Sequence, residues 1–179
     1  AMKYFIIFTL LAFLGVVFYI DILKHIINSG YWEGLKVVPI VMAAEIFMGI
    51  YFNLSFWYKL IDKTYWGAIF SFIGCAVLIA INVIFVPTYG YMACAWAGFA
   101  GYGVAMVLSY IIGQKYKPID YDLKSIFLYT AVAVALFFGN EYIPYPNAAI
   151  AFTARTVMIF AFVAIVLKKE KINIKAIKR

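Results

Sequence analysis

The chain has 179 residues, of which 67% are hydrophobic, 20% aromatic and only 13% charged. Typical soluble domains are roughly 45–50% apolar, and a chain of this length has too little interior to bury the excess, so the composition excludes an ordinary soluble protein. The net charge of +7 does not indicate a nucleic-acid partner, because the charges lie in short breaks between apolar runs and in a basic tail. Such runs are typical of helices that cross a membrane.

Six apolar runs are each close to the roughly 17–25 residues that a crossing helix needs. We therefore expect an all-α, polytopic membrane bundle of six transmembrane helices in a single domain over residues 1–179. The expected spans lie at about residues 4–23, 37–57, 66–86, 92–112, 123–139 and 148–167, followed by a basic tail at 168–179. The polar stretch from Asp21 to Glu33 either extends the first helix outward or lies along the membrane interface.

Basic residues are strongly biased to one face if the six spans alternate. Only Lys24 and Lys36 fall on the other face, partly balanced by Asp21 and Glu33. The basic face carries Lys3, Lys59, Lys63, Lys115, Lys117, Lys124, Lys168, Lys169, Lys171, Lys175, Lys178 and Arg179. Because lysine and arginine are retained in cytoplasmic loops, both termini are expected in the cytoplasm.

Small residues recur every four positions in the fourth span. Residues four apart share a helix face, and small side chains let helix backbones approach closely in lipid. The fourth-span ridge consists of Ala93, Ala97, Gly101, Ala105 and Ser109, and a similar face in the third span consists of Gly67, Ser71, Gly74 and Cys75. We predict that these two faces serve helix packing.

Two charged residues lie inside expected spans. Glu45 begins a stripe that continues through Gly49 to Asn53, and Arg155 lies in the sixth span. A charge within a span costs at least about 2.5 kcal/mol unless it meets a partner or water. Glu45 and Arg155 would each lie on the order of 10–12 Å below the outer surface. We hypothesise that both line a hydrated cavity, with Asn53 nearby, as substrate-binding or ion-coupling groups; a purely structural pair is the alternative.

The remaining polar residues predict no enzyme. Asn82 is expected to cap its helix or bond to a neighbouring one, and the single His25 is expected at the surface. Asp122 is expected to cap the fifth span, although Asp120 and Asp122 together also resemble a metal-nucleotide carboxylate pair. The two cysteines have no metal-binding spacing. We therefore expect no catalytic residues, no metal and no cofactor.

Three segments together resemble bacterial polysaccharide or O-antigen flippases, which are lipopolysaccharide biosynthesis proteins of the multidrug/oligosaccharidyl-lipid/polysaccharide exporter superfamily. They are Gly34–Pro39, Asn53–Thr64 and Asn82–Tyr91, the last followed by Ala95-Trp96-Ala97. The resemblance covers roughly residues 31–139. Family members have about twelve to fourteen spans in two lobes, so this chain is similar to a carboxy-terminal half. The resemblance therefore implies a missing amino-terminal lobe, or a second chain, as a partner.

If the resemblance holds, the whole transporter moves an undecaprenyl-pyrophosphate-linked oligosaccharide across the bacterial inner membrane for cell-surface polysaccharide synthesis. Partners are then the lipid-linked oligosaccharide and membrane lipids, and no nucleic acid. Arg155 could meet the pyrophosphate, and Glu45 could couple a proton or sodium ion. Three alternatives stay open: a cation-coupled multidrug exporter of the same superfamily, a membrane-embedded transferase of envelope polymer synthesis, and a non-transporting assembly subunit.

Overall fold

A computed structural model describes residues 2–143 and 147–177, and all regular structure in these ranges is helical. Helices suit an apolar chain in lipid, because a helix satisfies its backbone hydrogen bonds within one segment. Within these ranges, five helical stretches are long and apolar enough to cross a membrane. The prediction of an all-helical, multi-pass membrane protein is supported, while the orientation of the termini stays a prediction.

The first expected span is not one continuous helix. Helix α1 covers Met2–Phe18, α2 covers Ile20–Leu23, and a 3-10 helix, η1, covers Ser29–Val37. Tyr19 leaves the helical conformation, with φ −106° and ψ 19°. The 17 residues of α1 therefore lie at the lower limit of length for a crossing, which corrects the expected continuous helix over residues 4–23.

The later helices follow the expected spans but differ at their ends. Their bounds are α3 Val38–Leu54, α4 Phe56–Leu60, α5 Tyr65–Tyr89, α6 Tyr91–Tyr116, α7 Leu123–Tyr142 and α8 Ala148–Ile177. The α5 helix continues through Pro87, because a proline so close to the helix end removes little of the hydrogen-bond ladder. Gly90 alone then reverses the chain, with φ +56°, a conformation that suits glycine. The α8 helix also continues past residue 167 into the expected tail.

The chain divides into two compact units. Unit 1 contains Ser29–Tyr121 together with the first two residues, and unit 2 contains Lys3–Asn28 together with the chain from Asp122 onward. Unit 1 therefore holds α3, α4, α5 and α6, whereas unit 2 holds α1, α2, α7 and α8. The expectation that all six spans form a single bundle stays a prediction.

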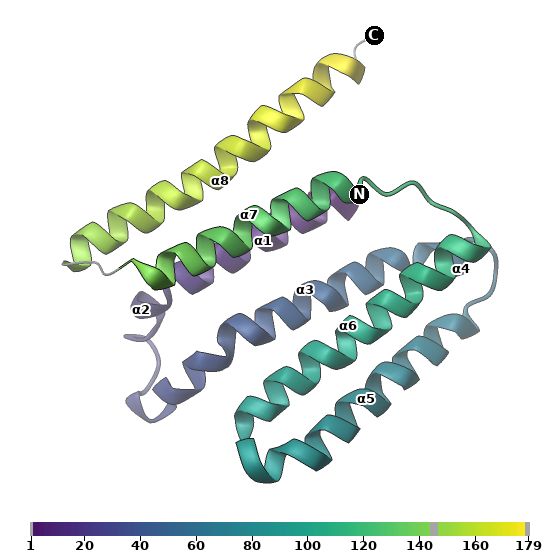
Figure 1. The fold of residues 1–179 in the computed structure, drawn as a ribbon, viewed down its shortest axis with the longest axis horizontal. Helices are drawn as coiled ribbons and strands as arrows, with labels where there is room; N and C mark the ends of the chain where they lie inside the picture. Colours follow the sequence, from purple (N-terminus) through teal and green to yellow (C-terminus); the bar gives the residue numbers. More distant parts are fainter. Residues whose placement is uncertain (1, 144–146, 178–179) are drawn as a thin grey trace. The chain divides into compact units, whose positions relative to one another are not determined.

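Within unit 1, α6 packs between α3 and α5 (Figure 1). At the crossing of α5 and α6, a Cβ added to Gly74 would lie 2.9 Å from the Gly101 carbonyl oxygen, and one added to Gly101 would lie 2.8 Å from the Gly74 oxygen. All five residues of the predicted fourth-span ridge are buried. The predicted packing role is therefore confirmed for the fourth-span ridge and for Gly74, whereas Ser71 and Cys75 of the third-span face are exposed.

Aromatic rings fill the end of unit 1 where α4, α5 and α6 meet. Trp57 stacks on Tyr116 with ring centroids 6.0 Å apart, and its Nε1 donates a hydrogen bond to the Ser109 hydroxyl at 3.3 Å. Gly113 makes room for this ring, because a Cβ there would lie 2.7 Å from the Trp57 side chain. Trp66 and Phe70 stack beside them at 5.4 Å. This end of unit 1 is thus a closely packed aromatic layer.

Unit 2 is held mainly by side chains rather than by close backbone approach. The rings of Phe13 in α1 and Phe137 in α7 lie 5.9 Å apart. Tyr129 and Ala133 of α7 and Phe162 of α8 are buried. Polar side chains join the helices at the two ends of the unit.

Candidate functional site

Glu45 projects from the exposed face of α3. The neighbouring Ala44 is 3% exposed and packs inside the protein, whereas Glu45 and Val41 are exposed. An exposed carboxylate in the middle of a crossing helix cannot face lipid without a large penalty. This face of α3 is therefore suited to an aqueous cavity or to a partner, as the sequence predicts.

Asn53 continues the same face of α3 two turns further along. Its side-chain Nδ2 donates to the Gly49 carbonyl oxygen of its own helix at 3.0 Å, which satisfies one donor locally. Asn53 lies on the same stripe as Glu45, because residues four positions apart share a helix face and Gly49 lies between them. The polar stripe inferred from the sequence thus exists on α3, while its role in binding or coupling stays a prediction.

Arg155 of α8 joins three parts of unit 2. Its Nη1 donates to Asp21 Oδ2 at 2.8 Å and to the Phe18 carbonyl oxygen at 2.9 Å, and its Nε donates to Asn140 Oδ1 at 3.1 Å. Phe18 is the last residue of α1, so the guanidinium satisfies a terminal carbonyl and meets the negative end of that helix. Arg155 therefore has a carboxylate partner in its own unit. The hypothesised pairing with Glu45, which belongs to unit 1, stays a prediction.

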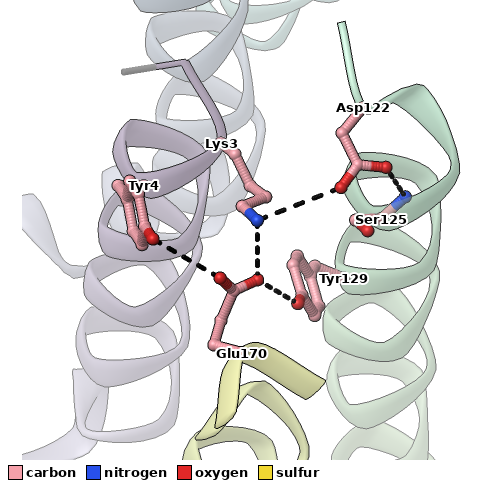
Figure 2. Close-up of polar contacts among 6 residues, drawn as sticks. All are labelled: Lys3, Tyr4, Asp122, Ser125, Tyr129 and Glu170. Atoms are coloured by element: carbon pink, nitrogen blue, oxygen red, sulfur yellow. Dashed lines mark hydrogen bonds and ion pairs between the residues drawn. The ribbon is translucent and has the colours of Figure 1, made fainter. Parts of the chain in front are cut away.

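A second polar cluster ties α1, α7 and α8 together at the opposite end of unit 2 (Figure 2). Lys3 Nζ lies 2.9 Å from Glu170 Oε1 and 3.9 Å from Asp122 Oδ2. Glu170 also accepts hydrogen bonds from the hydroxyls of Tyr129 at 3.0 Å and Tyr4 at 3.5 Å. Glu170 is only 7% exposed. A carboxylate this buried requires such partners, so the cluster fixes α8 against α1 and α7.

The polar surroundings at this end shift the pKa values of Lys3 and Asp122. The hydrogen bond to Glu170 raises the pKa of Lys3 above its ordinary value of 10.5. Hydrogen bonds from Ser125, including that from its backbone N–H to Asp122 Oδ1 at 3.2 Å, lower the pKa of Asp122 below its ordinary value of 3.8. Both groups are therefore charged at neutral pH. The Ser125 bond also confirms the prediction that Asp122 caps the helix that begins at Leu123.

The other singled-out residues have simpler surroundings. His25 is exposed, as expected, and its Nδ1 lies 2.9 Å from the Asp21 carbonyl oxygen. Asn82 does not cap its helix as expected, because α5 continues to Tyr89. Its buried Oδ1 has no hydrogen-bond partner among the described residues, so a bond to a neighbouring helix stays a prediction. Within the same described ranges, no three histidine, cysteine or acidic side chains gather as a metal site would require.

The Lys3–Glu170 cluster was not predicted from the sequence. Glu170 is the only acidic residue from Ala148 to the end of the sequence and stands between Lys169 and Lys171. An acid isolated among lysines is a weak signal of a specific ion pair, because most charges near helix ends are solvated. Its partners come from residues more than forty positions away, which single-sequence patterns do not connect.

No family model, curated protein or solved structure matches the chain. The class of the protein therefore rests on its own features. The described chain is a multi-pass helical membrane protein with a polar stripe on an exposed face of α3 and two polar clusters that join helices in unit 2.

Proposed function

We propose that the chain is one lobe of a flippase that moves undecaprenyl-pyrophosphate-linked oligosaccharide across the bacterial inner membrane. The observation that carries this proposal is the exposed Glu45 on α3, in line with Gly49 and Asn53. A charge at that depth requires water or a partner opposite it. An aqueous cavity between two lobes supplies both, and in two-lobed transporters the substrate site lies at the lobe interface.

The sequence resemblance supports the same unit. The three segments that resemble polysaccharide flippases contribute the start of α3, the α3–α4 end with its turn, and the α5–α6 reversal at Gly90. All three belong to unit 1, which also carries Glu45. Unit 1 is thus the part of the lobe that we expect to face the cavity.

Arg155 serves the proposed transport in one of two ways. It contacts the anionic pyrophosphate after exchanging its partner Asp21, whose side chain is 64% exposed, or it holds the end of α1 while α8 moves. A guanidinium matches phosphate oxygens well, which favours testing the first role. Replacement by lysine would retain the charge but lose the planar donor geometry.

The direct test measures glycan movement in liposomes. The chain is reconstituted with its amino-terminal lobe or partner chain, and a fluorescent oligosaccharide on undecaprenyl pyrophosphate is followed by a membrane-impermeant quencher. We expect flipping by the wild type and its loss in Glu45→Gln. The matched control Glu33→Gln, which removes an exposed acid outside the α3 crossing, should flip normally. Equal activity of Glu45→Gln and wild type would contradict a cavity role for Glu45.

The same preparation separates the rival functions. Efflux of cationic dyes without glycan movement would identify a cation-coupled drug exporter. A transferase would lose activity when Asp120, Asp122 and His25 are neutralised together, whereas the flippase should tolerate that change. An assembly subunit would tolerate neutral substitutions at both Glu45 and Arg155.

A further inference from the structure

A group of lysines surrounds the aromatic end of unit 1. Lys59 lies in α4 and Lys63 in the turn after it, while Lys115 and Lys117 flank Tyr116 at the end of α6. Lys59, Lys115 and Lys117 are exposed, and Lys63 is partly exposed. No acidic side chain of the described residues lies within ion-pair distance of these lysines. We call these four residues the lysine rim.

Two of the four ammonium groups are placed by neighbouring rings. Lys63 Nζ lies 4.7 Å from the centroid of the Tyr116 ring, and Lys59 Nζ lies 5.9 Å from that of Phe56. The Tyr116 contact crosses from the α4–α5 turn to α6, so it brings the lysines of both segments to one end of the unit. Each lysine side chain carries about 2 kcal/mol of rotamer entropy, and placing it in advance lowers the cost of binding.

The backbone of the turn fixes this arrangement. The Lys63 N–H donates to the Tyr58 carbonyl oxygen at 2.9 Å, and the Asp62 N–H lies 3.4 Å from the Lys59 oxygen. Asp62 has φ +56°, so the pattern is a Schellman motif with Asp62 in the left-handed position. The turn therefore holds Lys63 toward Tyr116 rather than leaving it on a flexible loop.

Apolar groups lie beside the charges. Phe56 is 58% exposed, Leu60 63% and Tyr65 53%. A ligand that meets unpaired cations and exposed apolar side chains together is itself amphipathic and negatively charged. Asp62 and Asp120 are also exposed at this end, which leaves a net charge of +2 from four lysines and two aspartates (4 − 2).

From this juxtaposition we propose that the lysine rim is a binding site for the headgroup of an anionic phospholipid, with the acyl chains lying against Phe56 and Leu60. The inference depends on the membrane-spanning character of the helices and not on the proposed transport function. A lipid phosphate is favoured over a free phosphate because only the lipid uses the exposed apolar surface. Basic sites beside membrane helices recognise anionic headgroups in this way.

The test uses the tryptophans that lie at the site. In a Trp32→Phe/Trp96→Phe background, only Trp57 and Trp66 fluoresce, since the chain has four tryptophans. The protein is placed in phosphatidylcholine nanodiscs with increasing fractions of phosphatidylglycerol, and the emission change gives the preference for the anionic lipid. With about 1 kcal/mol per lysine and 1.4 kcal/mol per tenfold, Lys59→Gln/Lys63→Gln should weaken this preference roughly 30-fold.

Four comparisons decide the result. The charge-conserving Lys59→Arg/Lys63→Arg should retain the preference, and the control Lys24→Gln/Lys36→Gln, which removes two lysines elsewhere, should leave it unchanged. A wild-type protein that responds equally to phosphatidylcholine and phosphatidylglycerol would overturn the proposal, as would an equal loss in the control. Displacement of the lipid response by millimolar inorganic phosphate at constant ionic strength would assign the site to free phosphate instead.

Discussion

The helices of the two units are held together by different interactions. In unit 1, α5 and α6 approach until Gly74 and Gly101 face each other's carbonyl groups. In unit 2, the backbones of α7 and α8 lie close over a much shorter stretch, and ion pairs hold the helices at both ends, through Glu170 and through Arg155. Helices in lipid gain no hydrophobic energy from association. The favourable energy of association must therefore come from close packing or from polar bonds.

This difference has a consequence for movement. Any shift of closely packed helices breaks van der Waals contacts along the glycine and alanine interface, so unit 1 is suited to remain rigid. Unit 2 instead depends on a small number of polar contacts, so the loss of one of them should loosen the unit. The contrast predicts that a substitution changes the stability of its own unit only. All four tryptophans belong to unit 1, so their fluorescence is a selective probe of that unit.

The largest effect is expected at Glu170. Glu170→Leu leaves Lys3 without its 2.9 Å partner and removes the acceptor of the buried Tyr129 hydroxyl, which should lower the free energy of unfolding by about 3 kcal/mol. Hydrogen exchange measured by mass spectrometry should increase in α8 but not in α5 or α6. The double variant Lys3→Met/Glu170→Leu should recover most of the loss; no recovery would mean that the ion pair is not the source of the effect.

A smaller loss is expected from filling the unit 1 crossing. Gly101→Ala places a Cβ 2.8 Å from the Gly74 oxygen and should cost about 1–3 kcal/mol, seen as earlier denaturation by tryptophan fluorescence in detergent micelles. Gly98→Ala is the matched control in the same helix, because its Cβ would meet nothing within 4 Å. Equal effects of the two substitutions would contradict the close approach of α5 and α6.

The charged cluster of unit 2 also predicts a pH dependence. The pKa of Lys3 is raised, so its stabilisation is present below 10.5 and is lost as the pH rises through the folded-state pKa. The pKa of Asp122 is lowered, so its smaller stabilisation is present above 3.8 and is lost as the pH falls through its folded-state value. Denaturation midpoints followed by a fluorophore on unit 2 should therefore be flat from about pH 5 to 9. The Lys3→Met variant should lose less stability at alkaline pH than the wild type, because Lys3 no longer titrates.

The smallest effect is expected in the turn of unit 1. Asp62 has a left-handed φ of +56°, which glycine adopts without strain, so Asp62→Gly should raise the free energy of unfolding by about 0.5 kcal/mol. Asp62→Val, which tolerates this conformation poorly, should lower it by about 1 kcal/mol. Chemical denaturation measures both. A stabilising Asp62→Val would show that the Schellman turn does not form.

Local signals predicted much of the fold. The lengths of the apolar runs predicted the helices. The packed face of α6 was predicted from the four-residue spacing of Ala97, Gly101 and Ala105, and a helix cap from Asp122 before Leu123. Each of these depends on residues close together in the sequence. The break at Tyr19 and the continuation of α5 through Pro87 were not predicted, because the length of an apolar run does not place helix breaks and helix ends.

The polar contacts of unit 2 show the same limit. The depth of Arg155 could be predicted from its position in the span, but its contacts with Phe18 and Asp21 depend on how α1 ends and where α8 passes. The pairing of Lys3 with Glu170 joins the two ends of the described chain. Spacing along one sequence contains no information on such distant pairs.

The most direct measurement determines on which side of the membrane the lysine-bearing end of each unit lies. Single cysteines are introduced at Lys63, Lys117, Lys168, Tyr89 or Glu141, in a Cys75→Ala/Cys94→Ala background, and labelled in intact cells with a membrane-impermeant maleimide. The six-span topology predicts protection at Lys63, Lys117 and Lys168, and labelling at Tyr89 and Glu141. Labelling that places Lys63 and Lys168 on opposite faces would contradict it.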